Sequence, residues 1–322
     1  MSDRLIEDTA ADVRRAAATL APYVRRTPLV FAPRLSEIAG ARVHLKLENL
    51  QHTGSFKYRG ACNRLLAMDA AARGAGVVAA SSGNHGAAVA RAAGELVVRA
   101  IVFVPQGTSA VKADAIRAGG ADLREFGTDG LDTEQHARDY ADRHGMVYVS
   151  PYNDPAVIAG QGTCGIEVFE EAKARKVALD ALLVCCGGGG LTAGCGLALE
   201  ALSPQTQLYA VEPEDYDDTK RSLQVGHPVP HPEAEASICD ALLSPQPGDI
   251  TFAVNRHRLA GGLTVSDAEV KAAMRFAFRT LKLVVEPGGA VCLAAVLAGK
   301  IDVADRVTGL TLSGGNVDAE LY

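Results

Sequence analysis

The sequence predicts an α/β protein built on parallel sheets. Short apolar runs alternate with alanine-rich helical patterns along its 322 residues, which is typical of this fold class. Runs such as residues 100–105 (AIVFVP) and 181–186 (ALLVCC) are almost entirely apolar, as strands are when helices cover both faces of a sheet. Four of the runs end in glycine. Because ligands of such sheets lie beyond the carboxyl ends of the strands, these loops could meet around one small molecule.

Four units carry these glycines and share one plan, an apolar run that leads into a glycine-containing loop. In chain order they cover residues 43–60, 76–86, 179–194 and 307–318. The first three continue into helical patterns at residues 61–68, 87–96 and 195–202, and the fourth lies near the end of the sequence. The repeated order of strand, loop and helix is what a parallel sheet requires.

We expect two lobes, because 322 residues exceed the usual size of one domain. Residues 65–147 are expected to form a smaller, mobile domain. The flanking segments 1–64 and 148–322 would together form a larger, discontinuous one. No internal repeat or low-complexity linker is evident.

Composition excludes several classes of function. A net charge of −6 and the lack of a basic run argue against a nucleic-acid partner. The first residues are too charged for a signal peptide, and the longest uncharged run, 181–199, is interrupted by four glycines, so no membrane partner is expected. Seven cysteines without metal-ligand spacing indicate reduced thiols. We therefore expect a soluble cytoplasmic protein that acts on a small molecule.

The glycine run at residues 187–190 predicts a phosphate site. It follows an apolar strand and opens a helix, where backbone N–H groups and the helix dipole attract anions. Gly188, Gly190 and Ala193 also fit the dinucleotide pattern G-x-G-x-x-A, and Glu212 closes the next apolar run, where an acid would bind a ribose hydroxyl. A nicotinamide-dependent oxidoreductase is therefore an alternative.

Lys57 lies in the glycine-bounded segment 54–60 (GSFKYRG). From the residues alone it could be a solvated charge, a phosphate clamp or a covalent nucleophile. A lysine in a glycine-rich turn, together with a phosphate site, suggests pyridoxal phosphate held by its phosphate and by a Schiff base.

Several long motifs then follow in one order along nearly the whole chain: RTPL (26–29), LKLENLQHTGSFKYRGA (45–61), SSGNHG (81–86), PYNDPAVIAGQGT (151–163), GGGG (187–190), VVEPGGAV (284–291) and LSGGNVD (312–318). On these motifs the chain resembles the fold type II pyridoxal-phosphate enzymes, the tryptophan synthase β-like fold, and within them the serine/threonine dehydratases and serine racemase. The resemblance implies two open, twisted α/β domains with the cofactor between them.

The resemblance also assigns roles. It implies that Lys57 forms the Schiff base and removes the α-proton of the substrate once displaced. Phe56 would pack behind the cofactor ring, and Asn84 would bond the 3-hydroxyl of the cofactor. The phosphate would lie in residues 187–190, and Ser313 would face the pyridine nitrogen. The substrate carboxylate would be bound by Ser81, Ser82, Gly83, Asn84 and His85.

Two further roles come from serine racemase. Ser82 matches its acid/base for the second face of the substrate, although it could simply be another hydrogen-bond donor. Glu212, Asp218 and the carbonyl of Tyr216 match positions that hold Mg²⁺ or Ca²⁺, and oxygen ligands suit such cations. The alternatives are a solvated acidic loop and, for Glu212, the ribose role.

Departures from the family affect the substrate. The arginine that recognises substrate in serine racemase falls at Thr133, and Ala241 stands where a glycine usually lies against the cofactor. The dehydratase of hydroxyectoine breakdown is also similar, in the segments LQHTGSFK and SPYNDPAVIAGQGT. A 3-hydroxyaspartate substrate would need an extra cation, for which His85 and His52 are candidates.

The resemblance implies elimination of water from a 3-hydroxy amino acid, such as L-threonine or L-serine, to give a 2-oxo acid and ammonia. Rivals within the family are 3-hydroxyaspartate dehydratase and serine racemase. A non-catalytic pyridoxal-binding module is a further alternative. A homodimer is expected by resemblance. Because the sequence ends shortly after residue 318, no regulatory domain and no inhibition by isoleucine are expected.

Overall fold

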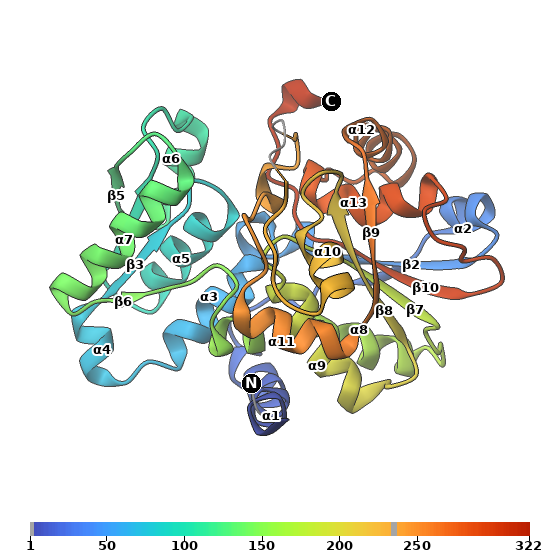
Figure 1. The fold of residues 1–322 in the computed structure, drawn as a ribbon, viewed down its shortest axis with the longest axis horizontal. Helices are drawn as coiled ribbons and strands as arrows, with labels where there is room; N and C mark the ends of the chain where they lie inside the picture. The colour runs from blue at the N-terminus through green and yellow to red at the C-terminus, as the bar shows by residue number, and fades with distance from the viewer. Residues whose placement is uncertain (1–2, 233–236) are drawn as a thin grey trace.

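The computed structural model describes residues 3–232 and 237–322. Within these residues the chain forms two α/β lobes, each built on one sheet, and the lobes lie on opposite sides of the molecule (Figure 1). The larger sheet has the strand order β1-β2-β10-β7-β8-β9, and the smaller has the order β5-β4-β3-β6. The predicted α/β fold class is therefore confirmed.

The larger sheet is parallel except for β1, which pairs with β2 in the antiparallel sense. Its strands are β1 (Leu29–Phe31), β2 (Arg42–Leu47), β7 (Ala181–Cys185), β8 (Gln207–Pro213), β9 (Leu259–Val265) and β10 (Val307–Leu312). β7 is buried along its whole length and β10 at all but its first residue. Burial on both faces explains why β7 reads as a continuous apolar run, whereas β10 keeps two buried threonines, Thr308 and Thr311.

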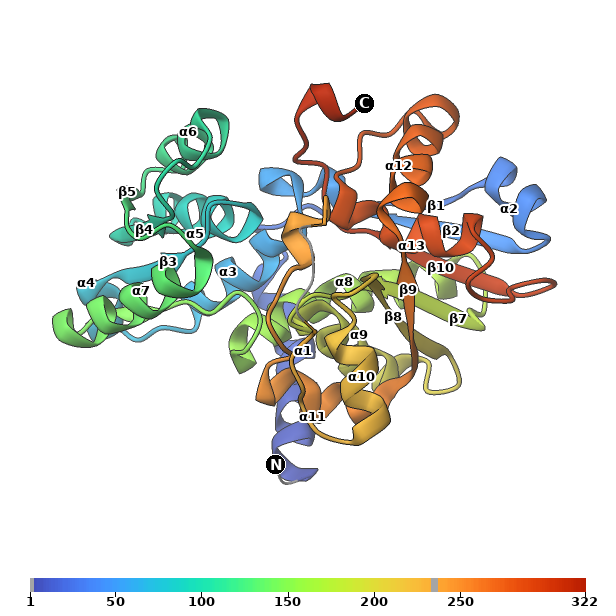
Figure 2. The same cartoon turned by 45° about the horizontal axis from the view of Figure 1, so that its top comes forward.

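Helices cover both faces of this sheet. They are α1 (Asp3–Leu20), α2 (Pro33–Ala39), α8 (Pro155–Ala174), α9 (Gly190–Leu202), α10 (Asp218–Val225), α11 (Asp249–Arg258), α12 (Asp267–Phe276) and α13 (Pro287–Leu297). The helix α3 (Lys57–Leu66) instead packs between α8 and α5 (Asn84–Glu95), and its buried residues join the core around the smaller sheet. In Figure 2, α12 and α13 lie above the strands, whereas α1 and α11 lie lower, and α1 packs on α8 and α9. The start of the central helix α8 is well defined by its sequence. The Asp154 carboxylate caps the helix by accepting hydrogen bonds from the N–H groups of Ala156 and Val157, and proline occupies the first helical position.

The smaller sheet is entirely parallel, and its strands are all drawn from residues 77–148. They are β3 (Val77–Ala80), β4 (Ala100–Val104), β5 (Asp122–Glu125) and β6 (Val147–Tyr148), with helices α4 (Ala70–Ala75), α5 (Asn84–Glu95), α6 (Ala110–Ala118) and α7 (Gly130–His144) around them. Below, this part is called the small lobe and the remainder the large lobe. The domain boundaries 1–64, 65–147 and 148–322 stay a prediction.

Short helices complete the described chain: η1 (Glu48–Leu50), η2 (His52–Gly54), η3 (Asp240–Leu242), the π-helix η4 (Ala277–Leu281) and η5 (Ala319–Leu321). No helix in residues 3–232 or 237–322 is long and apolar enough to cross a bilayer.

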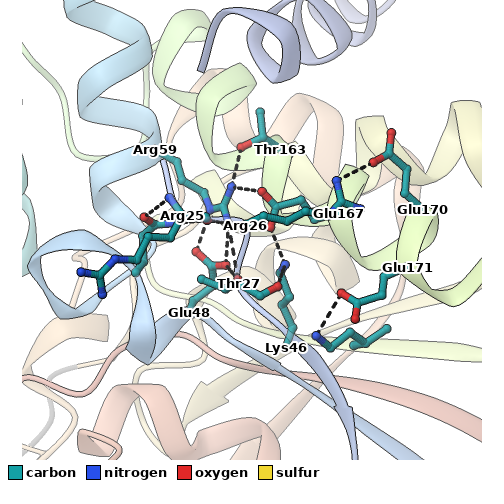
Figure 3. A network of polar contacts seen from close by, with 12 residues as sticks. Arg25, Arg26, Thr27, Lys46, Glu48, Arg59, Thr163, Glu167, Glu170 and Glu171 are labelled. Carbon is teal, nitrogen blue, oxygen red and sulfur yellow. Dashed lines mark hydrogen bonds and ion pairs between the residues drawn. The ribbon is translucent and has the colours of Figure 1, made fainter. Parts of the chain in front are cut away.

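A buried ionic network fixes α3, the helix that starts at Lys57 (Figure 3). The Arg59 guanidinium donates to Glu48 at 2.7 and 2.8 Å and to Glu167 on α8 at 2.7 and 2.8 Å. Lys46 of β2 also bonds Glu167, at 2.5 Å. Burial opposes ionisation of Glu48, but the charges of Arg59 and Lys46 together with the hydrogen bonds from Arg59 and Thr27 outweigh it and lower the pKa of this carboxyl. The network thus ties α3 to β2 and α8 through charges that compensate one another.

Candidate functional site

A cavity of about 900 Å³ lies between the two lobes. Residues of both lobes line it, and they include every predicted cofactor and substrate residue: Phe56, Lys57, Ser81, Ser82, Gly83, Asn84, His85, Gly187, Gly188, Gly189, Gly190 and Ser313. The three residues predicted to hold a metal, Glu212, Tyr216 and Asp218, are not part of its lining. The volume is in the range of sites that enclose a cofactor with a small substrate.

Lys57 is held at the cavity by backbone contacts between two loops. Phe56 N donates to Ser313 O at 3.1 Å, and Ser55 forms an isolated antiparallel bridge with Gly314. The Lys57 ammonium donates to the carbonyl of Pro151 at 2.9 Å. Burial lowers the pKa of Lys57 to about 8. A lysine with such a pKa is partly neutral near physiological pH and is therefore able to act as a nucleophile or a base.

Residues 187–190 form a cradle that only glycine permits. A Cβ at Gly188 would lie 2.4 Å from the Tyr152 ring, and a Cβ at Gly190 would lie 2.5 Å from Gln161 Oε1. Gly189 has a φ of 88°, in the left-handed region, and caps the N-terminus of α9. Thr251 Oγ1 donates to Gly188 O at 2.7 Å and so fixes the loop from outside. Backbone N–H groups at the start of a helix that lines the cavity suit a phosphate.

The dinucleotide alternative required Glu212 to reach a ribose. Its side chain is instead fully buried. Its two oxygens accept the backbone N–H groups of Thr219 and Lys220 at 2.8 and 2.9 Å. Glu212 therefore fixes the start of α10 and offers nothing to a ligand in the cavity, which argues against a nicotinamide cofactor.

The SSGNHG loop connects β3 to α5. Gly83 N donates to Ser81 Oγ at 3.2 Å, so one predicted carboxylate donor is engaged within the loop. His85 is buried, and its Nε2 contacts the carbonyl of Val149 at 2.8 Å. Burial, with the nearby charge of Lys57, lowers the pKa of His85 to about 3. The ring is therefore neutral and donates its Nε2 proton to Val149, so His85 does not supply a cation to the substrate.

A hydrogen-bonded chain that was not predicted from the sequence crosses from the small to the large lobe. Asn316 Nδ2 donates to Asn84 Oδ1 at 2.6 Å, and Asn84 Nδ2 donates to Glu286 Oε1 at 2.6 Å. Burial raises the pKa of Glu286 to about 7, although the bond from Asn84 acts in the opposite direction. A Cβ at Gly314 would lie 2.1 Å from Glu286 Oε1, so glycine makes room for this carboxylate. The sequence feature that could have pointed to Glu286 is a single acidic residue between an apolar run and the segment Pro-Gly-Gly.

Ser313 follows β10, is buried and lines the cavity. Its neighbour at the end of β7 is Cys185, whose pKa burial raises to about 12 despite the Ser313 hydroxyl. The thiol is therefore uncharged. The groups near the predicted position of the pyridine nitrogen are thus neutral and weakly polar.

The predicted metal residues lie at the start of α10. Among described residues, the oxygens of Asp218 are buried and meet no hydrogen-bond partner apart from its own backbone N–H. Burial raises the pKa of Asp218 to about 7. It also raises that of Glu212 well above the usual range, and the charge of Asp218 adds to the effect. In the described chain no group of three or more His, Cys, Asp or Glu side chains is arranged for a metal. A cation would nevertheless satisfy the two orphaned oxygens.

The positions that depart from the family are also placed. Thr133 lines the cavity, but its hydroxyl contacts the carbonyls of Phe126 and Asp129 at 2.8 and 2.6 Å. Ala241 lines the cavity within η3. His52 lies outside the lining and packs edge-on against Tyr58, with a pKa that burial lowers. Neither Thr133 nor the two histidines therefore replace the missing arginine.

Known proteins match this chain over nearly its whole length. The family description "Pyridoxal-phosphate dependent enzyme" matches residues 20–314. The chain is 43% identical over 311 residues to an L-threo-3-hydroxyaspartate ammonia-lyase of Pseudomonas sp, which covers 97% of this chain and 96% of the relative. It is 36% identical over 322 residues to serine racemase of Schizosaccharomyces pombe, which covers 100% and 98% of the two chains. The solved structure of maize serine racemase superimposes with a TM-score of 0.91 at 33% identity, over 96% of this chain and 94% of the other.

Proposed function

The chain belongs to the family of pyridoxal-phosphate dependent enzymes, and we propose that it is an ammonia-lyase that removes water from a 3-hydroxy amino acid. The products are a 2-oxo acid and ammonia. The observation that carries this proposal is Lys57, a buried amine with a pKa of about 8 that faces the same cavity as the glycine cradle and the SSGNHG loop. The names of the relatives, which include ammonia-lyases of several hydroxy amino acids, support it.

The cavity fits pyridoxal phosphate. Residues 187–190 would receive the phosphate, because they line the cavity at the start of α9, where backbone N–H groups attract anions. Phe56 would contact the ring, Ser313 would face its nitrogen, and Asn84 retains a second amide proton for the 3-hydroxyl. When bound, the cofactor supplies a covalent attachment for the substrate amine and withdraws the electron density that develops at Cα.

The residues of this chain then supply positioning and proton transfer. The Ser81–His85 loop binds the substrate carboxylate through backbone N–H groups at the start of α5. Lys57 Nζ takes the α-proton, for which its neutral form is required. The carbonyl of Pro151, 2.9 Å from Nζ, orients the amine. The buried Glu286 fixes Asn84 from behind.

Serine racemisation is a second candidate, favoured by the presence of Ser82 in the cavity lining. A racemase needs a proton donor on the face of the substrate opposite Lys57, and the Ser82 hydroxyl would be that donor. A divalent cation, Mg²⁺ or Ca²⁺, is proposed at Asp218 and Glu212 with the carbonyl of Tyr216, on the strength of the orphaned Asp218 oxygens. Homodimer assembly and a cytoplasmic location stay predictions.

The test is release of 2-oxo acid and ammonia from purified holoenzyme with both serine enantiomers, L-threonine and the stereoisomers of 3-hydroxyaspartate. Lys57→Ala should abolish turnover of any substrate. Lys271→Ala, an exposed lysine of α12 outside the cavity, is the matched control and should retain it. If the wild-type holoenzyme releases no 2-oxo acid or ammonia from any of these substrates, the proposed elimination is contradicted. Interconversion of serine enantiomers without elimination would favour the racemase.

A further inference from the structure

The cavity contains few positive charges. Among the described residues that line it, only three side chains can be cationic: Lys57, His85 and Lys112. Lys57 is assigned to the cofactor and the α-proton, and burial keeps His85 neutral. Lys112 is therefore the remaining cation, and no sequence motif pointed to it.

Lys112 projects into the cavity from the small lobe. It lies on α6 together with Val111 and Ala115, which also line the cavity. One turn further along the same face, Ile116 packs on the substrate loop, since its Cδ1 would lie 3.1 Å from a Cβ at Gly86. The helix that carries Lys112 therefore packs directly on the loop that is predicted to bind the substrate α-carboxylate.

Lys112 has a partner that a ligand could replace. Its ammonium contacts Asp240 of η3 at 2.8 Å, across the opening between the lobes. The two side chains are 40% and 62% exposed. Exposed pairs of this kind contribute little to stability, so exchange of Asp240 for another carboxylate costs little.

We propose that Lys112 binds the second carboxylate of a dicarboxylic 3-hydroxy amino acid, of which 3-hydroxyaspartate is the simplest, in exchange for Asp240. The inference rests on the proposed function and specifies the substrate class of the same site. Lys112 would take the place of the arginine that is absent at Thr133, from a different helix. A monocarboxylic substrate such as L-serine has no group for Lys112 and leaves its pair with Asp240 intact.

The exchange predicts opposite effects for the two partners. Lys112→Gln should lower kcat/KM for 3-hydroxyaspartate by about tenfold or more, chiefly through KM, because a charge-assisted hydrogen bond is lost. Asp240→Asn removes a competing carboxylate and should leave kcat/KM for 3-hydroxyaspartate unchanged or raise it. Turnover of L-serine or L-threonine should change little in either variant. Lys112→Arg should restore part of the lost activity.

Arg117→Gln is the matched control, because Arg117 lies on the same helix, is exposed, pairs with Asp114 and is outside the cavity lining. A second readout is free of turnover. Succinate, a dicarboxylate without the reacting groups, should raise the melting temperature of the wild-type holoenzyme and of the control, but not that of Lys112→Gln.

The outcomes separate the inference from the function on which it rests. If Lys112→Gln and Asp240→Asn impair the dicarboxylic and monocarboxylic substrates alike, the pair merely joins the lobes and the inference is wrong. If the wild type converts L-threonine or L-serine but no isomer of 3-hydroxyaspartate, the inference is again overturned while the proposed elimination stands. If the wild type converts none of the substrates, both the inference about Lys112 and the proposed elimination are overturned.

Discussion

Replacing Arg59 by leucine should lower the free energy of unfolding by about 3–5 kcal/mol, the usual cost of removing one partner from a buried ion pair. The side chains of Arg59 and Glu48 are fully buried, and that of Glu167 is 10% exposed. Without Arg59, Glu167 keeps its bond to Lys46, but Glu48 keeps only the hydrogen bond from the hydroxyl of Thr27. The cost therefore arises mainly from one poorly compensated carboxylate at Glu48 (Figure 3).

Urea unfolding followed by circular dichroism measures this loss. Arg64→Leu is the matched control, because Arg64 lies on the same helix and pairs with Asp154 at 2.8 Å, but its side chain is 23% exposed. This variant should lose clearly less than Arg59→Leu, because Asp154 keeps its hydrogen bonds from the N–H groups of Ala156 and Val157. Adding Glu48→Gln to Arg59→Leu removes the orphaned charge and should recover part of the stability. Equal losses for Arg59→Leu and Arg64→Leu, or no recovery in the double variant, would refute the reasoning.

Three further results are expected. The rate at which apoenzyme captures pyridoxal phosphate, followed by absorbance, should rise with pH through an apparent pKa of about 8, since only neutral Lys57 attacks and burial lowers its pKa; a rise centred at the ordinary lysine value would contradict this. Gly188→Ala should weaken cofactor binding by about tenfold in a fluorescence titration, because its Cβ would lie 2.4 Å from the Tyr152 ring. Tyr152→Ala in the same chain should restore part of the affinity, and its failure would show that the clash is not the cause. Millimolar Mg²⁺ or Ca²⁺ should raise the melting temperature of the wild type but not of Asp218→Asn, and an equal rise in both would place the cation elsewhere.

Local sequence patterns predicted much of the fold. β7 was recognisable because burial on both faces leaves only apolar residues, and the loops after β7 and β10 because close backbone packing requires glycine at some of their positions. β9 was not predicted, since its glycines at 261 and 262 weaken the strand pattern. The pairing of β2 with β10 joins residues more than 250 positions apart, and no local pattern encodes it.

The site was predictable to the extent that single motifs define it. All the predicted cofactor and substrate residues line one cavity, although their roles await experiment. Charge states were less accessible, because they depend on neighbours distant in sequence. The sequence made His85 a candidate cation, but its burial and its contact with the carbonyl of Val149 keep it neutral. Lys112 was overlooked because its partner, Asp240, lies on the other lobe.

The backbone contacts between the Lys57 loop and the Ser313 loop have a consequence for how defects in this protein should separate. Two backbone hydrogen bonds join the two loops within the large lobe: Phe56 N donates to Ser313 O, and Gly315 N donates to Gly54 O at 2.9 Å. Movement of the small lobe can therefore reposition the substrate loop without altering the distance between the lysine and the serine. Retention of the coloured cofactor and turnover of substrate should then be separable for most positions. Substitutions in the small lobe away from Asn84, which is predicted to contact the cofactor, should yield variants that stay yellow yet work poorly, whereas damage to the joined loops should yield colourless ones.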